Sequence, residues 1–178
     1  MIIHKVNLYH LRMPLQAPFE TSFGRIYERD CILVEAFANG LVGYGECVAD
    51  RDPGYSYETS TTAWHILRDY LVPAILGKDI SEPQAMHGLV SHVRGHPMAK
   101  AGLEMALWDL TGKMQGRSLR QLFGGVRERV EVGVSVGIQE TPQELLKVVE
   151  NFLKQGYSRV KIKIKPGKDV EYAQTVRR

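Results

Sequence analysis

The last quarter of the chain alternates strand and helix patterns, and this order most constrains the fold. Residues 130–138 are almost all apolar or small, as in a buried strand. Thr141 and Glu144 match a capping box at the start of a helix, and Gly156 can end that helix. A second strand is predicted over 159–165, followed by the start of another helix. Strands that alternate with helices form parallel sheets, so the sequence predicts the beginning of an α/β domain.

The strand–helix pattern stops after two strands. Two parallel strands leave the faces and edges of a sheet uncovered. A (β/α)₈ barrel needs about 250 residues, whereas the whole sequence has 178. We therefore expect a barrel that is incomplete in this chain, within a sequence that is part of a longer one. A small, self-sufficient α/β domain is the alternative.

The second of these strands carries lysines at alternate positions. Side chains alternate between the two faces of a strand, so Lys161, Lys163 and Lys165 are predicted to share one face. Ile162 and Ile164 then point to the other face, where a crossover helix requires apolar residues. Ammonium groups gathered on the inner face indicate chemistry on an anion. The alternative is a set of solvated lysines that protect an edge strand.

The N-terminal part predicts an antiparallel sheet. Residues 2–11, 30–38 and 41–48 alternate as strands, and Asn39-Gly40 is a strong signal for a two-residue hairpin turn. Residues 14–27 contain two prolines, which are excluded from central strands, so a loop that carries aromatic side chains is predicted there. That loop is either tucked against the core or a lid over a substrate.

The same hairpin turn determines what the two cysteines can do. It pairs Ile32 with Cys47, which directs Cys31 and Cys47 to opposite faces of the sheet. We therefore expect two buried thiols in a reducing compartment rather than a disulfide.

Helices are predicted between the hairpin and the barrel-like region. Ser56 can cap a helix to about Leu71, which Pro73 would stop, and a second helix covers residues 82–93. An Ala- and Leu-rich helix follows Pro97 and ends near Gly116. Its small residues favour close packing against another element.

Composition excludes some classes of function. The sequence is 44% hydrophobic and 24% charged, with a net charge of only +3, which gives no support to nucleic-acid binding. It has no apolar run long enough to span a membrane, and its N-terminus lacks a signal-peptide core. A cytoplasmic enzyme or binding protein is expected, with no nucleic-acid or membrane partner.

The ordered set of motifs resembles a known family. AKAGLEMALWDL in the Ala/Leu helix is followed by LFGG, by GVSVGI and by the KxK strand. This order is similar to that of the enolase superfamily, and within it to the o-succinylbenzoate synthase / N-acylamino acid racemase group, over essentially the whole chain. The resemblance implies an α+β N-terminal capping domain over 1–97, connecting helices over 98–129, and the first βαβα of a TIM-type barrel over 130–178.

The resemblance also implies a reaction. In this family a divalent metal, Mg²⁺ or Mn²⁺, binds the substrate carboxylate, and a lysine removes the proton α to it. Lys163 is then the base, while Lys161 biases it electrostatically and contacts the carboxylate. Lys165 is not part of the pattern and is expected at the rim. The complete enzyme would act on a small-molecule carboxylate and form a homo-oligomer.

Five further residues are assigned by their positions. The resemblance implies that two N-terminal loops close over the barrel mouth, where Phe19, Phe23 and Tyr55 would form an apolar pocket for an acyl or aryl group. Asp50 in the same wall is more polar than expected. Ser135 lies in the C-terminal half of the first barrel strand, where such enzymes place site residues, although a plain buried serine is the alternative.

No metal ligands are assigned in this chain. The resemblance places an Asp/Glu/Asp ligand set and a second lysine on later strands, and His92 and His96 are separated by a helix-breaking Gly95. One base suffices for the elimination that yields o-succinylbenzoate in menaquinone synthesis, whereas racemisation needs two. The isolated chain is therefore expected to be inactive. A non-catalytic domain that binds a small anion is the alternative.

Overall fold

The computed structural model describes residues 1–177, which gather into two compact units. The first unit contains Met1–Met13 and Arg29–Val126, and the second contains Pro14–Glu28 and residues from Arg127 onward. Among the helices of the described residues, none combines the length and apolar character needed to cross a bilayer.

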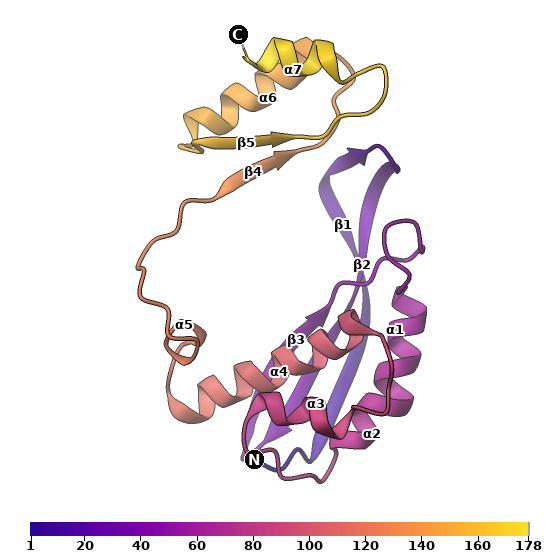
Figure 1. The fold of residues 1–178 in the computed structure, drawn as a ribbon, viewed down its shortest axis with the longest axis vertical. Coiled ribbons are helices and arrows are strands. Elements are labelled where there is room, and N and C mark those ends of the chain that lie inside the picture. The colour runs from indigo at the N-terminus through magenta and orange to yellow at the C-terminus, as the bar shows by residue number, and fades with distance from the viewer. Residues whose placement is uncertain (178) are drawn as a thin grey trace. The chain divides into compact units, whose positions relative to one another are not determined.

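A three-stranded sheet forms the framework of the first unit (Figure 1). Its strands are β1 (Lys5–Thr21), β2 (Gly24–Ala38) and β3 (Leu41–Cys47), in the order β1-β2-β3. β2 and β3 are antiparallel, and Ile32 pairs with Cys47 as the hairpin turn predicts. Asn39 and Gly40 both have positive φ, 51° and 75°, which is the geometry of the predicted two-residue turn.

The two cysteines are free and buried. Burial raises the pKa of the Cys31 thiol, and burial also raises the pKa of Cys47 to about 11. Both side chains therefore stay protonated at neutral pH and act as small apolar residues.

The prediction of a loop over 14–27 is wrong. β1 continues through Pro14 and Pro18 to Thr21, and β2 begins at Gly24, so the two strands form one long hairpin. The physical reason is the position of β1 at the edge of the sheet. An edge strand has one side without a hydrogen-bonding neighbour, and a proline that lacks its N–H is tolerated there.

The first helical stretch is longer than predicted and begins later. It consists of α1 (Ser60–Ile66), a π-helical turn η1 (Leu67–Leu71) and α2 (Val72–Ile75). Thr59, not Ser56, caps it, in a reciprocal arrangement with Thr62. Pro73 does not stop the helix, because it lies in the first turn of α2, directly after the wide π turn.

The remaining helices of the first unit are short except for one. They are the 3₁₀ turn η2 (Pro83–Ala85), α3 (Met86–Leu89), α4 (Pro97–Gln115) and α5 (Leu119–Leu122). The single helix predicted over 82–93 is thus wrong in extent. α4 ends as predicted, at a left-handed Gly116 with φ 60°.

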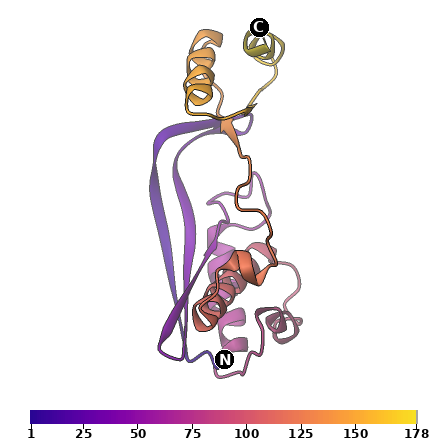
Figure 2. The same ribbon diagram turned by 90° about the vertical axis from the view of Figure 1, so that its left-hand side faces the viewer.

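All the helices of this unit lie on one face of the sheet (Figure 2). On that face α4 packs so closely against β3 that the two backbones come into contact. Gly43 and Gly45 face α4, and a Cβ atom added to either would overlap a backbone carbonyl of that helix. Gly102 contributes from the helix side, where an added Cβ would lie 2.9 Å from the backbone nitrogen of Cys47. The core around this contact includes Ile32, Val34, Leu67, Leu71, Leu103, Ala106, Leu107 and Leu110.

A buried carboxylate caps α4 from a distant part of the chain. Glu58 is 1% exposed, and its two carboxylate oxygens accept hydrogen bonds from the backbone nitrogens of Met98 (2.7 Å) and Ala99 (3.1 Å). His96, the residue at the N-cap position, makes no such bond and has a left-handed backbone. Glu58 thus satisfies helix N–H groups that have no partner within the helix.

Replacing Glu58 with alanine is expected to destabilise the first unit by about 3 kcal/mol, because it leaves buried N–H groups without an acceptor. The free energy of unfolding from urea titration would measure this. Glu82→Ala, at an exposed side chain, serves as the control and should change stability by less than about 0.5 kcal/mol. Equal stabilities of the two variants would contradict the assigned role of Glu58.

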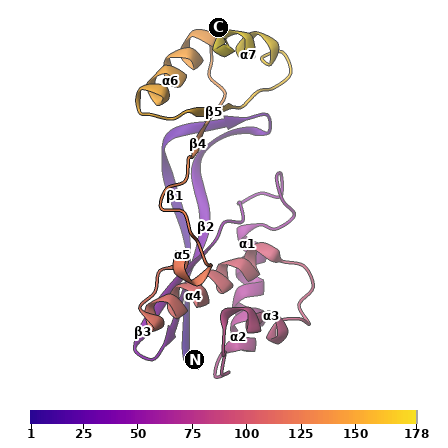
Figure 3. The same ribbon diagram turned by 60° about the vertical axis from the view of Figure 1, so that its left-hand side comes forward.

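The second unit contains the predicted start of a parallel sheet. β4 (Gly133–Val136) and β5 (Arg159–Ile162) pair in parallel, and α6 (Pro142–Lys154) connects them. α7 (Val170–Arg177) follows β5, and α6 and α7 cover the same face of the strands (Figure 3). The Thr141–Glu144 capping box is confirmed. Both strands are shorter than the ranges 130–138 and 159–165 that the sequence predicts.

Candidate functional site

The two faces of β4 and β5 differ in chemistry. Val136 and Ile162 are partners across the ladder and pack with Leu145, Val149 and Tyr172 beneath α6 and α7. Ser135 and Lys161 are also partners and belong to the opposite face. The prediction that Ile162 faces the helices is confirmed, and the lysine side is the face that helices do not cover.

Lys163 extends this arrangement by one position. Its backbone N–H donates to the carbonyl of Val136 (2.9 Å), so the ladder continues past the last residue of β5. Alternation then directs the Lys163 side chain to the face of Lys161. Lys161 is exposed and Lys163 half-buried. Within residues 1–177, the ammonium groups of these two lysines form no hydrogen bond or ion pair.

Ile164 departs from the predicted alternation. It is 48% exposed and does not join the apolar cluster beneath the helices. The reason is that β5 ends at Ile162 and the chain turns at Pro166 and Gly167, which has φ 81°. The prediction that Ile164 helps to cover the helix side is therefore wrong.

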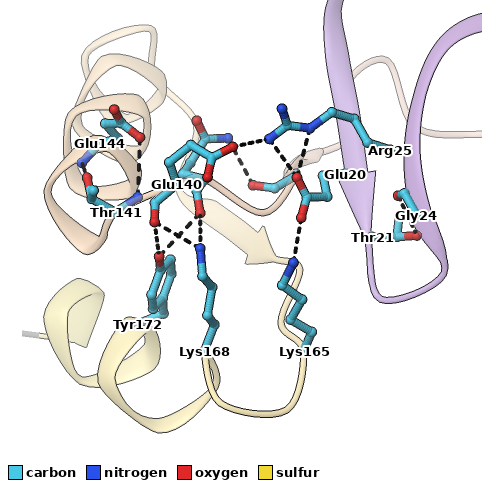
Figure 4. Close-up of polar contacts among 12 residues, drawn as sticks. Glu20, Thr21, Gly24, Arg25, Glu140, Thr141, Glu144, Lys165, Lys168 and Tyr172 are labelled. Carbon is cyan, nitrogen blue, oxygen red and sulfur yellow. Dashed lines mark hydrogen bonds and ion pairs between the residues drawn. The ribbon is translucent and has the colours of Figure 1, made fainter.

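Lys165, expected at the rim, is paired with a carboxylate. Its Nζ donates to Oε1 of Glu20 at 2.7 Å, and the Nε of Arg25 donates to Oε2 of the same carboxylate at 2.8 Å (Figure 4). The hydrogen bond from Lys165, followed by the one from Arg25, lowers the pKa of Glu20 below its usual value. Glu20 therefore stays ionised at neutral pH, and the stabilisation from this pair is lost only as the pH falls through that lowered value.

The hairpin tip places one predicted aromatic residue beside the parallel strands. Phe19 is half-buried, and its Cδ2 would lie 3.3 Å from a Cβ added to Gly137. Phe23 is 76% exposed. Ser135, which the sequence assigned to the site or to the core, is exposed. The structure brings Phe19 to the end of β4 and leaves Phe23 at the surface of the tip.

The other two predicted contact residues belong to the first unit. Asp50 forms an ion pair with Arg29 (2.9 Å), which explains a carboxylate at a position expected to be apolar. Tyr55 is 80% exposed. Their assignment to a substrate pocket stays a prediction.

Sequence reasoning missed Glu20 and Arg25. They flank the tip of the β1–β2 hairpin and face each other as a charged cross-strand pair. The signal was present in the opposite charges on either side of Thr21–Gly24, but it has meaning only if this segment is interpreted as a hairpin.

The described residues do not provide a metal site. Among residues 1–177, no group of three or more His, Cys, Asp or Glu side chains is arranged to hold a metal ion. His96 lies instead beside the buried Glu58, with Nδ1 3.9 Å from its carboxylate. The residues present do not fit the metal that the family resemblance implies, and no reaction step is derived through it.

The N-terminal domain of the mandelate racemase / muconate lactonizing enzyme family matches residues 3–124, well over half of the chain. This chain is a member of the enolase superfamily. A solved member of that superfamily from Listeria innocua superposes on 99% of the chain with a TM-score of 0.91 at 39% identity. The predicted fold class, a capping domain followed by the start of a barrel, is confirmed.

Curated relatives of this enolase superfamily member carry the names of the predicted group. It is 48% identical over 177 residues to o-succinylbenzoate synthase from Geobacillus stearothermophilus, covering 99% of the chain and 47% of the relative. It is 47% identical to N-succinylamino acid racemase from Thermus thermophilus, covering 99% of the chain and 48% of the relative. The chain thus spans about half the length of the curated relatives it matches.

Proposed function

We propose that this chain supplies the capping part and one acid–base lysine of an enzyme that removes the proton α to a carboxylate. The names of its relatives suggest two such reactions, the formation of o-succinylbenzoate and the racemisation of N-succinylamino acids. Both begin by breaking a C–H bond next to a carboxylate. In this proposal Lys163 is the base.

The observation that supports this assignment is the contrast among the three lysines. Lys165 is held by Glu20, whereas Lys161 and Lys163 have no acceptor within residues 1–177. Both belong to the sheet face opposite α6 and α7. Removing the α-proton creates additional negative charge next to the substrate carboxylate, and the ammonium group of Lys161 would stabilise such charge.

Each lysine has a distinct part in the proposed step. The neutral amine of Lys163 accepts the α-proton, and the ammonium group of Lys161, two residues before it, contacts the substrate carboxylate. We assign to Ser135, directly opposite Lys161, a hydrogen bond donated to the substrate. Phe19 and Phe23 offer apolar contacts to its acyl or aryl group.

When bound, the family's divalent metal would supply positive charge at the substrate carboxylate. We propose that its ligands, and the second lysine required for racemisation, belong to protein beyond the described residues. Elimination needs only the base that this chain carries. The synthase reaction therefore requires fewer acid–base residues from protein outside this chain than the racemase reaction does.

A chimera tests the proposal. The chain would be joined to the C-terminal part of the Geobacillus stearothermophilus synthase, from which its own half differs at about half of the positions. We expect the chimera to form o-succinylbenzoate at a rate within about tenfold of the Geobacillus parent, and to lose activity in EDTA. A folded chimera that forms no product, beside an active parent, would contradict the proposed function.

The isolated 178-residue chain is expected to be inactive and to bind Mg²⁺ no more tightly than about 1 mM, because the described residues lack a carboxylate cluster. Isothermal titration with Mg²⁺ and NMR of α-proton exchange in deuterated water would measure both. Exchange by the chain alone would contradict the expectation. Succinate binding that is unaffected by EDTA would favour the alternative, a non-catalytic anion-binding domain.

A further inference from the structure

The tip of the β1–β2 hairpin is fastened to the strand ends of the second unit. The backbone N–H of Ile138, just after β4, donates to the carbonyl of Glu20 (3.0 Å). The side chain of the same glutamate accepts from Lys165, just after β5 (2.7 Å). One residue therefore contacts the segments that leave both parallel strands. Figure 4 shows its bond to Lys165.

Arg25 extends this fastening to the loop that follows β4. Its guanidinium contacts the carboxylates of both Glu20 and Glu140. The backbone of Glu140 is itself held in place, because its carbonyl accepts from Tyr172 Oη (2.7 Å) and from Lys168 Nζ (2.9 Å). Tyr172 is only 3% exposed. Tyr172, the last residue in this series of contacts, is thus buried in the apolar cluster of α6 and α7.

The absence of a side chain at Gly137 makes this approach possible. A Cβ there would lie 3.1 Å from the backbone nitrogen of Glu20 and 3.3 Å from its carbonyl oxygen. Such distances are tight for a real Cβ contact. The hairpin tip therefore lies directly against the backbone between β4 and its following loop.

We propose that Glu20 is a positioning residue for Lys163 and acts through a clasp formed by Glu20, Arg25, Glu140 and Lys165. This inference rests on the proposed function. Lys165 follows Lys163 by two residues, and β5 has already ended at Ile162. Past that point the backbone is held by the ladder bond of Lys163 to Val136, by the turn bond of Lys168 to Lys165 and by the ion pair of Lys165 with Glu20.

Burial makes the Glu20–Lys165 pair more than a surface contact. The side chain of Glu20 is 15% exposed and that of Lys165 37%. Partly buried charges are screened less by salt and water than exposed ones, and charge-assisted hydrogen bonds are the stronger kind. We therefore expect the pair to limit local opening of the hairpin tip.

Hydrogen exchange of the 178-residue chain tests the clasp without any reference to activity. In Glu20→Gln we expect the Ile138 amide to exchange about tenfold faster than in the unmodified chain, while amides within α4 are unchanged. Glu150→Gln, at an exposed position on α6, is the matched control and should leave Ile138 unaffected. An unchanged Ile138 rate in folded Glu20→Gln would overturn the clasp.

The partner of Glu20 is tested by Lys165→Gln and by the double variant. If Lys165 is the partner that matters, Lys165→Gln and Glu20→Gln should accelerate Ile138 exchange by similar factors, and the double variant no further. Independent, multiplying effects of the two substitutions would overturn the role of Lys165.

The positioning role is tested in the chimera. Glu20→Gln should lower kcat about tenfold and change KM by less than about threefold, because the base is misplaced rather than removed. Glu20→Asp, which keeps the charge on a shorter side chain, should recover part of kcat. An unchanged kcat in Glu20→Gln would overturn the positioning role. An inactive unmodified chimera would instead contradict the proposed function, and the exchange measurement separates these two results.

Discussion

Replacing Lys163 with methionine in the chimera is expected to lower the rate of o-succinylbenzoate formation by about 10³-fold. Methionine keeps the length of the side chain but offers no group to accept a proton, and a positioned acid–base group contributes about 10²–10⁴-fold. The decrease should appear in kcat, with little change in KM, because the base acts in the transition state. Steady-state kinetics followed by absorbance would measure it.

Two other lysine variants distinguish the loss of the base from the loss of a positive charge. Lys154→Met, at an exposed position at the end of α6, controls for the loss of one positive charge and should leave the rate unchanged. Lys161→Met should raise KM as well as lower kcat, because Lys161 is assigned to contact the substrate carboxylate and to stabilise the negative charge that develops beside it. A Lys163→Met chimera that keeps its rate would refute the assignment of the base.

Replacing Gly45 with alanine is expected to cost the first unit more than about 4 kcal/mol, a large part of the free energy of unfolding of an ordinary domain. A Cβ at this position would overlap the carbonyl oxygen of Gly102 and lie 2.6 Å from the backbone nitrogen of Ala106. Both atoms belong to the backbone of α4, so no side-chain rotation relieves the overlap. The helix has to move away from β3 and open the core.

Gly88→Ala is the matched control for this substitution. An added Cβ at Gly88, in α3, meets nothing within 4 Å, and alanine favours helix. Its stability should equal or slightly exceed that of the unmodified chain. Circular dichroism during urea titration would compare the two variants. Similar unfolding midpoints for Gly45→Ala and Gly88→Ala would contradict the close helix–strand contact.

Several local signals were interpreted correctly, and in each of them the chemistry lies within a few residues. The turn at Asn39-Gly40, the capping box of Thr141 with Glu144 and the C-cap at Gly116 all appear in the structure. Each depends on hydrogen bonds between residues close in the sequence. Such patterns specify a local backbone conformation almost independently of the rest of the fold.

Errors arose where the surroundings of a segment determine whether it forms a strand, a helix or a loop. Pro14 and Pro18 indicated a loop, because the sequence does not say that β1 lies at the edge of a sheet. Pro73 indicated a helix end, because the π turn before it leaves no trace in the sequence. A proline has no backbone N–H to donate, and only the tertiary structure shows whether an acceptor would otherwise have been bonded at that position.

By itself, the sequence determined the order of elements, the resemblance to the enolase superfamily and the face on which Lys161 and Lys163 lie. These follow from periodicity and from motifs in a fixed order. Only the tertiary structure paired Glu20 with Lys165, 145 residues apart, and brought Glu58 to the backbone of Met98, 40 residues away. The reason is physical. A side chain's periodicity gives its direction, whereas its partner depends on how separate elements pack, and no local pattern encodes that packing.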